Sequence, residues 1–178
     1  MHFVCIEILC FVACPLAEFF YFAIQIFYNI CSQEDSAYDQ LIHGIRYLDL
    51  RVAHDPGTEE KFWINHGAVR MRPLEAIVSG IQRFVNETGE VVFMDIHRFP
   101  SGFDSEEDHN ELIEYMIGKL GDFLALRSVT NDVTFDQLWA TGKTIIWGYA
   151  NSSIQMKHDF LWPAVDHVSI NFRQMYTI

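Results

Sequence analysis

From Ser36 onward the sequence alternates between short strand-like segments and longer amphipathic segments. Residues 47–52 place apolar and polar side chains alternately, which is typical of a strand with one buried face. Further short strands are predicted at residues 62–66, 91–96 and 144–149. Repeated strand–helix units join parallel strands through right-handed crossovers, with helices covering the sheet. The sequence therefore predicts an α/β fold, either a barrel or an open sheet.

Two long helices are expected between these strands. Pro73 opens the first at the position that proline favours, and Gly89 ends it. The second follows the acidic residues 104–108, which lack the glycine and the alternate spacing of a calcium loop and are expected to be its solvated start. A shorter capped helix is expected at residues 134–139. The apolar face predicted for the second helix comprises Leu112, Ile113, Met116, Ile117 and Leu120.

Residues 3–30 form an apolar run unlike the rest of the chain. The run exceeds the roughly 20 residues that a membrane-spanning helix needs. However, Glu7 and Glu18 would each cost about 2.5–3.5 kcal/mol near the bilayer centre, and Pro15 would kink the helix. No lysine or arginine precedes Arg46. Three interpretations stay open: a membrane anchor or uncleaved signal, a buried helix or strand pair, and a segment that is not native to the domain.

Charge and cysteine content exclude several classes of function. The net charge is −12, which argues against nucleic acid and against a polybasic membrane patch, although one or two cations could still bind a compact anionic headgroup. All four cysteines lie within the first 31 residues, so no disulfide or thiolate metal site is expected in the remainder. No glycine-rich nucleotide-binding motif is present either.

Polar and titratable residues gather at the ends of the predicted strands. In a parallel α/β sheet the chemistry lies at the carboxyl ends of the strands. A guanidinium can hold phosphate oxygens, and an imidazole can donate a proton to a departing alkoxide, so this set suits phosphoryl chemistry. The residues at these ends are Asp49 and Arg51, Asn65 and His66, Asp95 and His97, and Trp147 and Tyr149.

Each of these residues also has a purely structural interpretation. Asp49 and Arg51 could form a structural ion pair, and His66 could cap a turn before a glycine. Asp95 and His97 could be a hydrogen-bonded pair that supports other residues. The remaining histidines are expected to be surface or core residues: His43, His54, His109, His158 and His167.

Three motifs resemble the X-domain-containing branch of the phosphatidylinositol-specific phospholipases C. They are Gly-Ile-Arg-Tyr-Leu-Asp-Leu-Arg at residues 44–51, Ile-Asn-His-Gly at 64–67, and Gly-Glu-Val-Val-Phe-Met-Asp-Ile-His-Arg-Phe at 89–99. Leu-Trp-Pro at 161–163 is similar to a later segment of the same branch. The resemblance covers roughly residues 36–167.

The resemblance implies a TIM-type barrel that cleaves inositol phospholipids at a membrane surface into diacylglycerol and a cyclic inositol phosphate. His66 matches the general acid, and Arg51 matches the phosphate-stabilising cation of the metal-independent enzymes, with Asp49 beside it. Arg51 stands where the calcium-dependent relatives have an acidic ligand, so no metal and no other cofactor is expected. The resemblance implies that Asp95 and His97 contact the inositol or the catalytic cluster, and we expect Tyr149 to bind substrate with them.

The sequence also departs from this family. It lacks the Gly-Ser-His-Asp-like stretch that carries the first catalytic histidine; upstream of Tyr38 the only histidine is His2. Residues 32–178 are also fewer than the ~250 of a full barrel. We therefore expect a partial barrel, truncated at both ends. Its expected parts are a hydrophobic segment (1–31), a partial catalytic domain (32–167) and a divergent tail (168–178).

These departures predict an impaired phospholipase C-type enzyme, since loss of a general base typically costs 10²–10⁴-fold in rate. The alternative is an inactive protein that binds a lipid headgroup. A glycerophosphodiester phosphodiesterase shares the barrel, but its His-Arg-Gly element and Glu-x-Asp metal pair are not found at the matching strands. Whether the chain is membrane-associated or cytoplasmic stays open, as does the inositol lipid used.

Overall fold

The computed structural model of the protein describes residues 35–67, 69–127 and 134–164. The chain divides into two units, residues 1–34 and 35–178, and the described residues belong to the second. Within them no helix has both the length and the apolar character needed to cross a bilayer. The expected hydrophobic segment (1–31) and divergent tail (168–178) lie outside the described residues.

In chain order the elements are α2 (Ala37–Ile42), β1 (Tyr47–His54), β2 (Phe62–His66), β3 (Val69–Pro73), α3 (Leu74–Thr88), β4 (Val92–Arg98), α4 (Glu106–Leu120), the 3₁₀ turn η1 (Gly121–Phe123), α5 (Phe135–Thr141), β5 (Ile145–Tyr149), α6 (Ser152–Gln155) and β6 (Leu161–Pro163).

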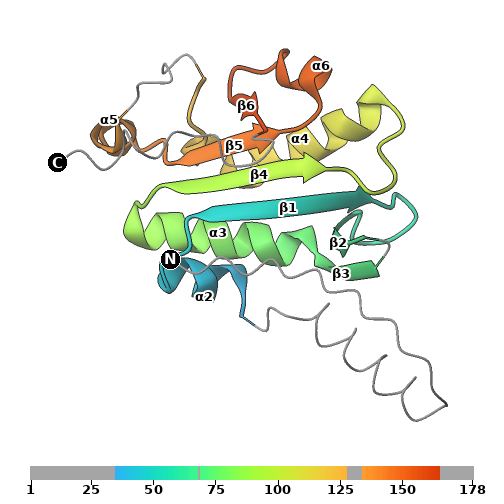
Figure 1. Cartoon of the computed structure of the whole chain (residues 1–178), viewed down its shortest axis with the longest axis horizontal. Coiled ribbons are helices and arrows are strands. Elements are labelled where there is room, and N and C mark those ends of the chain that lie inside the picture. The colour runs from blue at the N-terminus through green and yellow to red at the C-terminus, as the bar shows by residue number, and fades with distance from the viewer. Residues whose placement is uncertain (1–34, 68, 128–133, 165–178) are drawn as a thin grey trace, which may run out of the picture. The chain divides into compact units, whose positions relative to one another are not determined.

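These strands form one six-stranded sheet in the order β3-β2-β1-β4-β5-β6 (Figure 1). Strands β1, β4, β5 and β6 are parallel, as the strand–helix alternation predicts. The predicted parallel sheet is wrong for β2, which is antiparallel to β1, and the unpredicted β3 is antiparallel to β2. The connection from β1 to β2, residues 55–61, is too short for a crossover, so the chain can only reverse there.

The expected barrel is not confirmed by this sheet. Among the described residues β3 and β6 are its edge strands, with no pairing between them. What the structure shows is a mixed α/β fold, and the barrel stays a prediction.

The core lies between one face of the sheet and helices α3 and α4. Leu48 and Leu50 of β1, with Met94 and Ile96 of β4, point into it and are buried. Most of the predicted apolar face of α4 joins this core, but Ile117 is 41% exposed, so its expected burial is wrong. Ile117 lies at the margin of the stripe that Leu112, Ile113, Met116 and Leu120 form, and the helix turns it towards solvent.

The helix ends follow the predicted signals. Pro73 is the N-cap of α3, one residue before the first helical position predicted for it, and Gly89 ends the helix with φ 66°, a left-handed conformation that favours glycine. Ser105 caps α4 and forms a reciprocal capping box with Asp108. Glu106, Glu107 and Asp108 lie in the first turn of α4, so the acidic stretch begins a helix, as expected.

Alternation along the strands leaves a second, polar face on the sheet. Because Leu48 and Leu50 point into the core, Tyr47, Asp49 and Arg51 belong to the opposite face of β1. The register of β1 with β4 pairs Asp49 with Asp95, which places the carboxylates of neighbouring strands on this same face. This face holds most of the predicted site residues.

Candidate functional site

The centre of the candidate site is a contact between a histidine and a carboxylate on neighbouring parallel strands. His97 Nδ1 of β4 lies 2.5 Å from Asp49 Oδ1 of β1. The Asp49 side chain is 46% exposed and that of His97 only 21%, so the imidazole is the more enclosed partner. Asp49 therefore pairs with His97 across the strands and not with Arg51.

Asp95 lies next to this pair and is almost fully buried, at 3% exposure. The Tyr47 hydroxyl donates a hydrogen bond of 2.6 Å to Asp95 Oδ2. Burial, and then the hydrogen bond with Asp95, raise the pKa of the Tyr47 hydroxyl above its usual value, so it keeps its proton and acts as a donor. The hydrogen bond from Tyr47 thus helps to fix the position of the Asp95 carboxylate.

Gly148 of β5 provides the space for this carboxylate. The register pairs Gly148 with Asp95. A Cβ atom at Gly148 would lie 2.4 Å from Asp95 Oδ1, which is closer than any real contact of that kind. Any larger residue there would force Asp95 to move.

A register shift brings two arginines together where the pairing of β1 with β4 ends. Leu50 pairs with Ile96, but Arg51 pairs with Arg98, so His97 is an extra residue in β4. Neither arginine has an ion-pair or hydrogen-bond partner within the described ranges. Two like charges at paired positions repel each other, so an anion that binds between the two arginines would relieve this repulsion.

His66 lies at the end of β2 and is exposed. Val52 of β1 pairs with Ile64, so Asn65 and His66 run alongside the part of β1 that contains Arg51. No hydrogen bond or ion pair joins His66 to another site residue in the part of the chain that is described. Strict alternation would place Asn65 rather than His66 on the polar face, but the β2–β3 register shifts between Ile64 and Asn65.

Tyr149 does not join the other predicted residues. It is 1% exposed on the core face of β5, where its hydroxyl lies 2.7 Å from His109 Nδ1 of α4. The register explains this placement, because Tyr149 pairs with Ile96, which also points into the core. Trp147, two residues earlier, is fully buried on the same face.

The chain offers no obvious metal site in its described part. No group of three or more His, Cys, Asp or Glu side chains there could hold an ion. The nearest approach at the candidate site is the Asp49–His97 pair with the buried Asp95 beside it.

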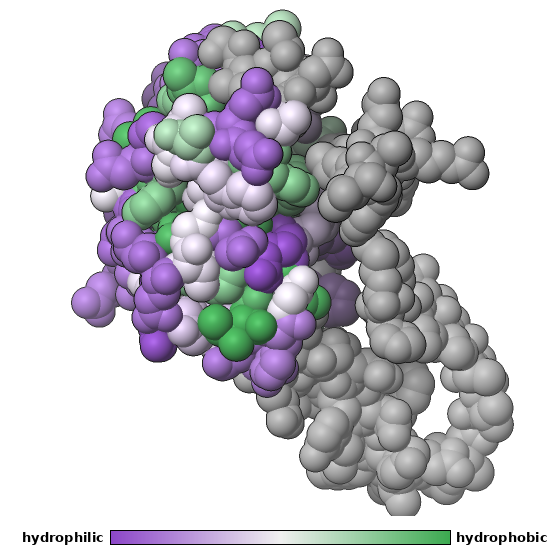
Figure 2. Space-filling model, turned by 90° about the vertical axis from the view of Figure 1, so that its left-hand side faces the viewer, coloured by the Kyte–Doolittle hydropathy of each residue, from purple (hydrophilic) through white to green (hydrophobic). Residues whose placement is uncertain are grey.

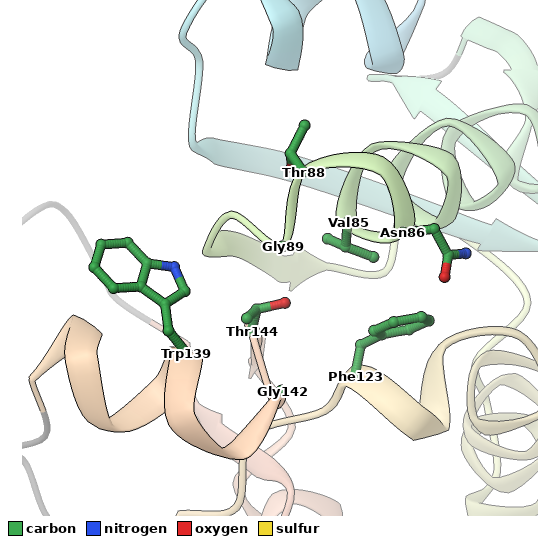
Figure 3. Close-up of a pocket in the computed structure, with 8 residues that line it drawn as sticks. All are labelled: Val85, Asn86, Thr88, Gly89, Phe123, Trp139, Gly142 and Thr144. Atoms are coloured by element: carbon green, nitrogen blue, oxygen red, sulfur yellow. The ribbon is translucent and has the colours of Figure 1, made fainter.

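A pocket of about 430 Å³ lies at the opposite end of the sheet, where β4 and β5 begin (Figure 3). None of its lining residues is titratable, so it lacks the groups that acid–base chemistry needs. In the coloured part of that end, Figure 2 shows mostly hydrophilic residues with hydrophobic ones in separate small groups. The residues lining the pocket are Val85, Asn86, Thr88, Gly89, Phe123, Trp139, Gly142 and Thr144.

Sequence reasoning missed three residues of the polar face. Tyr47 could have been found, because it stands two residues before Asp49 in an alternating strand. Gly148 and Arg98 could not, since their roles depend on the registers that join β4 to its neighbours.

Comparison with known proteins agrees with the resemblance inferred from the three motifs. A scan against protein-family models finds no match. PI-PLC X domain-containing protein 1 of Homo sapiens is 32% identical over 131 residues, which cover 72% of this chain and 39% of that protein. PI-PLC X domain-containing protein 2 of Mus musculus is 25% identical over 127 residues, which cover 70% of this chain and 36% of that protein. The chain thus spans about two fifths of the length of these curated relatives.

The fold has a counterpart among solved structures. An S. aureus phosphatidylinositol-specific phospholipase C superimposes with a TM-score of 0.50 at 17% identity, over 65% of this chain and 38% of that one. At this identity the likeness concerns the fold alone. The predicted similarity to the phosphatidylinositol-specific phospholipases C is confirmed by the curated relatives, and the mixed α/β fold by this structure.

Proposed function

Because the chain is a homologue of the PI-PLC X domain-containing proteins, we propose that it is a phosphodiesterase of the phospholipase C type that cleaves inositol phospholipids. The observation that carries this proposal is the polar face of the sheet at β1 and β4. There Asp49, Asp95 and His97 lie on adjacent parallel strands beside an arginine that has no ion-pair partner among the described residues. His97 and Arg98 stand at the carboxyl end of β4, and the carboxyl ends of parallel strands are where α/β enzymes place their reacting groups.

In this proposal Arg51 binds the phosphate of the substrate. Among the residues that the structure describes, no carboxylate engages its guanidinium, and the neighbouring Asp49 is paired with His97. A guanidinium can hold two phosphate oxygens at once and stabilise the charge that builds on them during attack at phosphorus. Arg51 thereby also takes the role that a divalent cation would otherwise fill, and the reaction needs no calcium.

His66 is the proposed general acid. Its exposed position at the end of β2 lets a substrate reach the imidazole from solvent. It donates a proton to the diacylglycerol oxygen as the bond between that oxygen and phosphorus breaks. Asp95, held by Tyr47, and His97 face the inositol ring from β4. Because the substrate is a lipid, the polar face of the sheet has to approach a membrane surface.

The test is release of water-soluble inositol phosphate from phosphatidylinositol vesicles by the 178-residue chain. We expect His66→Ala to lower turnover by about 10²–10⁴-fold and Arg51→Ala by about 10²–10³-fold. EDTA should leave the wild-type rate unchanged. The matched controls are His43→Ala and Arg83→Ala, two exposed residues on helices away from the polar face, which should keep full turnover.

Two results would count against the proposal. One is no release by the wild-type chain at any vesicle concentration. The other is release that survives both His66→Ala and Arg51→Ala unchanged. Retained vesicle binding without release would mean that the chain only recognises the headgroup.

A further inference from the structure

The contact between Asp49 and His97 determines which nitrogen of the imidazole carries a proton. A carboxylate only accepts hydrogen bonds, so the His97 Nδ1 that lies 2.5 Å from Asp49 Oδ1 carries a proton. In the neutral ring Nε2 is then the basic atom. Nε2 has no hydrogen-bond partner in the described part of the chain. A carboxylate thus fixes the tautomer and leaves the opposite nitrogen open, which is the arrangement of a general base.

The position of His97 in the sheet supports the same role. It is the extra residue where β4 slips against β1, between Ile96 and Arg98. Bulges of this kind redirect side chains and are frequent next to active sites.

Two carboxylates and two guanidinium groups lie around His97, and the guanidinium groups can bind a phosphate. Asp49 and Arg51 approach from β1, and Asp95 and Arg98 flank it on β4. The residue of β5 that pairs with Asp95 is Gly148, which has no charge. Arg51 stands two residues beyond Asp49, about 7 Å along the strand. When Arg51 holds the phosphate of the substrate, the attacking hydroxyl of the inositol ring is therefore within reach of the imidazole that Asp49 orients.

We propose that His97, oriented by Asp49, is the general base that deprotonates the inositol hydroxyl as it attacks phosphorus. This inference rests on the proposed phospholipase C-type function. The hydroxyl proton moves to His97 Nε2, and an electron pair of the inositol oxygen forms the new bond to phosphorus. The bond from phosphorus to the diacylglycerol oxygen breaks, and that oxygen takes the proton of His66. The products are cyclic inositol phosphate and diacylglycerol, and exchange with solvent restores both histidines.

The test compares variants of His97 and Asp49 in the vesicle assay, with kcat and KM measured across pH. We expect His97→Gln to lower kcat by about 10²–10⁴-fold with KM nearly unchanged, because glutamine still forms hydrogen bonds but cannot take the proton. His97→Ala should lose as much, and added imidazole should restore part of its rate. Asp49→Asn should lower kcat and alter the acidic limb of the pH profile. His43→Gln, at an exposed helix end, is the matched control and should behave as wild type.

The outcomes separate this inference from the proposed function. A wild-type chain that releases no inositol phosphate overturns both. An active wild type whose His97→Gln variant keeps its kcat overturns the inference alone. So does a loss in His97→Ala that appears only in KM and is not rescued by imidazole, since His97 would then only bind substrate. Unchanged thermal melting of His97→Gln excludes unfolding as the cause of a lower rate.

Discussion

At the scale of single residues, the polar face depends on the absence of a side chain at Gly148. Its Cβ position would lie 2.4 Å from Asp95 Oδ1 and 3.1 Å from Asp95 Cγ, inside a buried part of the sheet. We expect Gly148→Ala to lower the free energy of unfolding by about 1–3 kcal/mol, because the buried carboxylate has to move. Urea denaturation followed by circular dichroism measures this change.

Gly118 of α4 provides the control for this substitution. A Cβ atom there meets nothing within 4 Å, and the residue is exposed in a helix. Gly118→Ala should therefore raise the free energy of unfolding by up to ~1 kcal/mol. If both substitutions shifted it in the same direction, helix or strand propensity alone would be at work and the close approach to Asp95 would not matter.

The same residues show how far the sequence predicts a site. The strand-end pattern selected Asp49, Asp95 and His97, which the structure brings together, because their strands are neighbours and parallel. It also selected Tyr149, but a strand end alone does not say which face a side chain takes. That depends on register, since Tyr149 pairs with the core residue Ile96.

At the scale of elements, His109 joins three parts of the core face. Its Nδ1 contacts the Tyr149 hydroxyl of β5 at 2.7 Å, and its Nε2 lies 3.0 Å from Asn151 Nδ2, just before α6. Asn151 Oδ1 accepts from Ile154 N, so the amide nitrogen faces His109 and Nε2 accepts its hydrogen bond. Nδ1 is then the protonated nitrogen, and the ring is neutral in the folded protein.

The His109 site predicts that stability depends on pH. Burial lowers the pKa of His109 from its usual 6.5, an effect that nearby Asp108 partly opposes. His109 therefore binds a proton less readily in the folded protein than in the unfolded chain. The contribution is fully present above pH 6.5 and is lost as the pH falls through the lower folded pKa, with a slope of at most about 1.4 kcal/mol per pH unit.

Urea denaturation between about pH 5 and 7 tests this dependence. His109→Gln should flatten the slope of the unfolding free energy over this range, whatever its effect on absolute stability. His43→Gln changes an exposed histidine and should keep the wild-type slope. An identical slope in wild type and His109→Gln would mean that other groups govern the pH dependence.

The predictability of elements follows local signals. Helix α3 begins after Pro73 and ends at Gly89 because both residues restrict the backbone locally, whatever the fold. Strand β3 was not predicted: its residues Val69–Pro73 include two arginines and a proline, and its extended form depends on pairing with β2. Local propensity therefore fixes helix ends better than edge strands.

At the scale of the whole molecule, the strand–helix alternation predicted the α/β fold but could not predict closure. Closure is decided by which strands meet at the edges of the sheet. Those edges are β3 and β6 in the described residues, and β1 and β4 lie between two neighbours each. The protection of backbone amides from hydrogen exchange should reflect this difference, because only strands with partners on both sides are held by global stability.

Native-state hydrogen exchange of the 178-residue chain measures this protection strand by strand. We expect the amides of residues 48–50 and 94–96, in the centre of the sheet, to exchange only through global unfolding, with free energies of about 5–15 kcal/mol. The amides of β3 should exchange orders of magnitude faster, since local fraying exposes them. Protection of β3 equal to that of β1 would contradict an edge position, because a further strand would then have to pair with it. That result would favour the closed barrel over the open sheet, since a barrel has no edge strands.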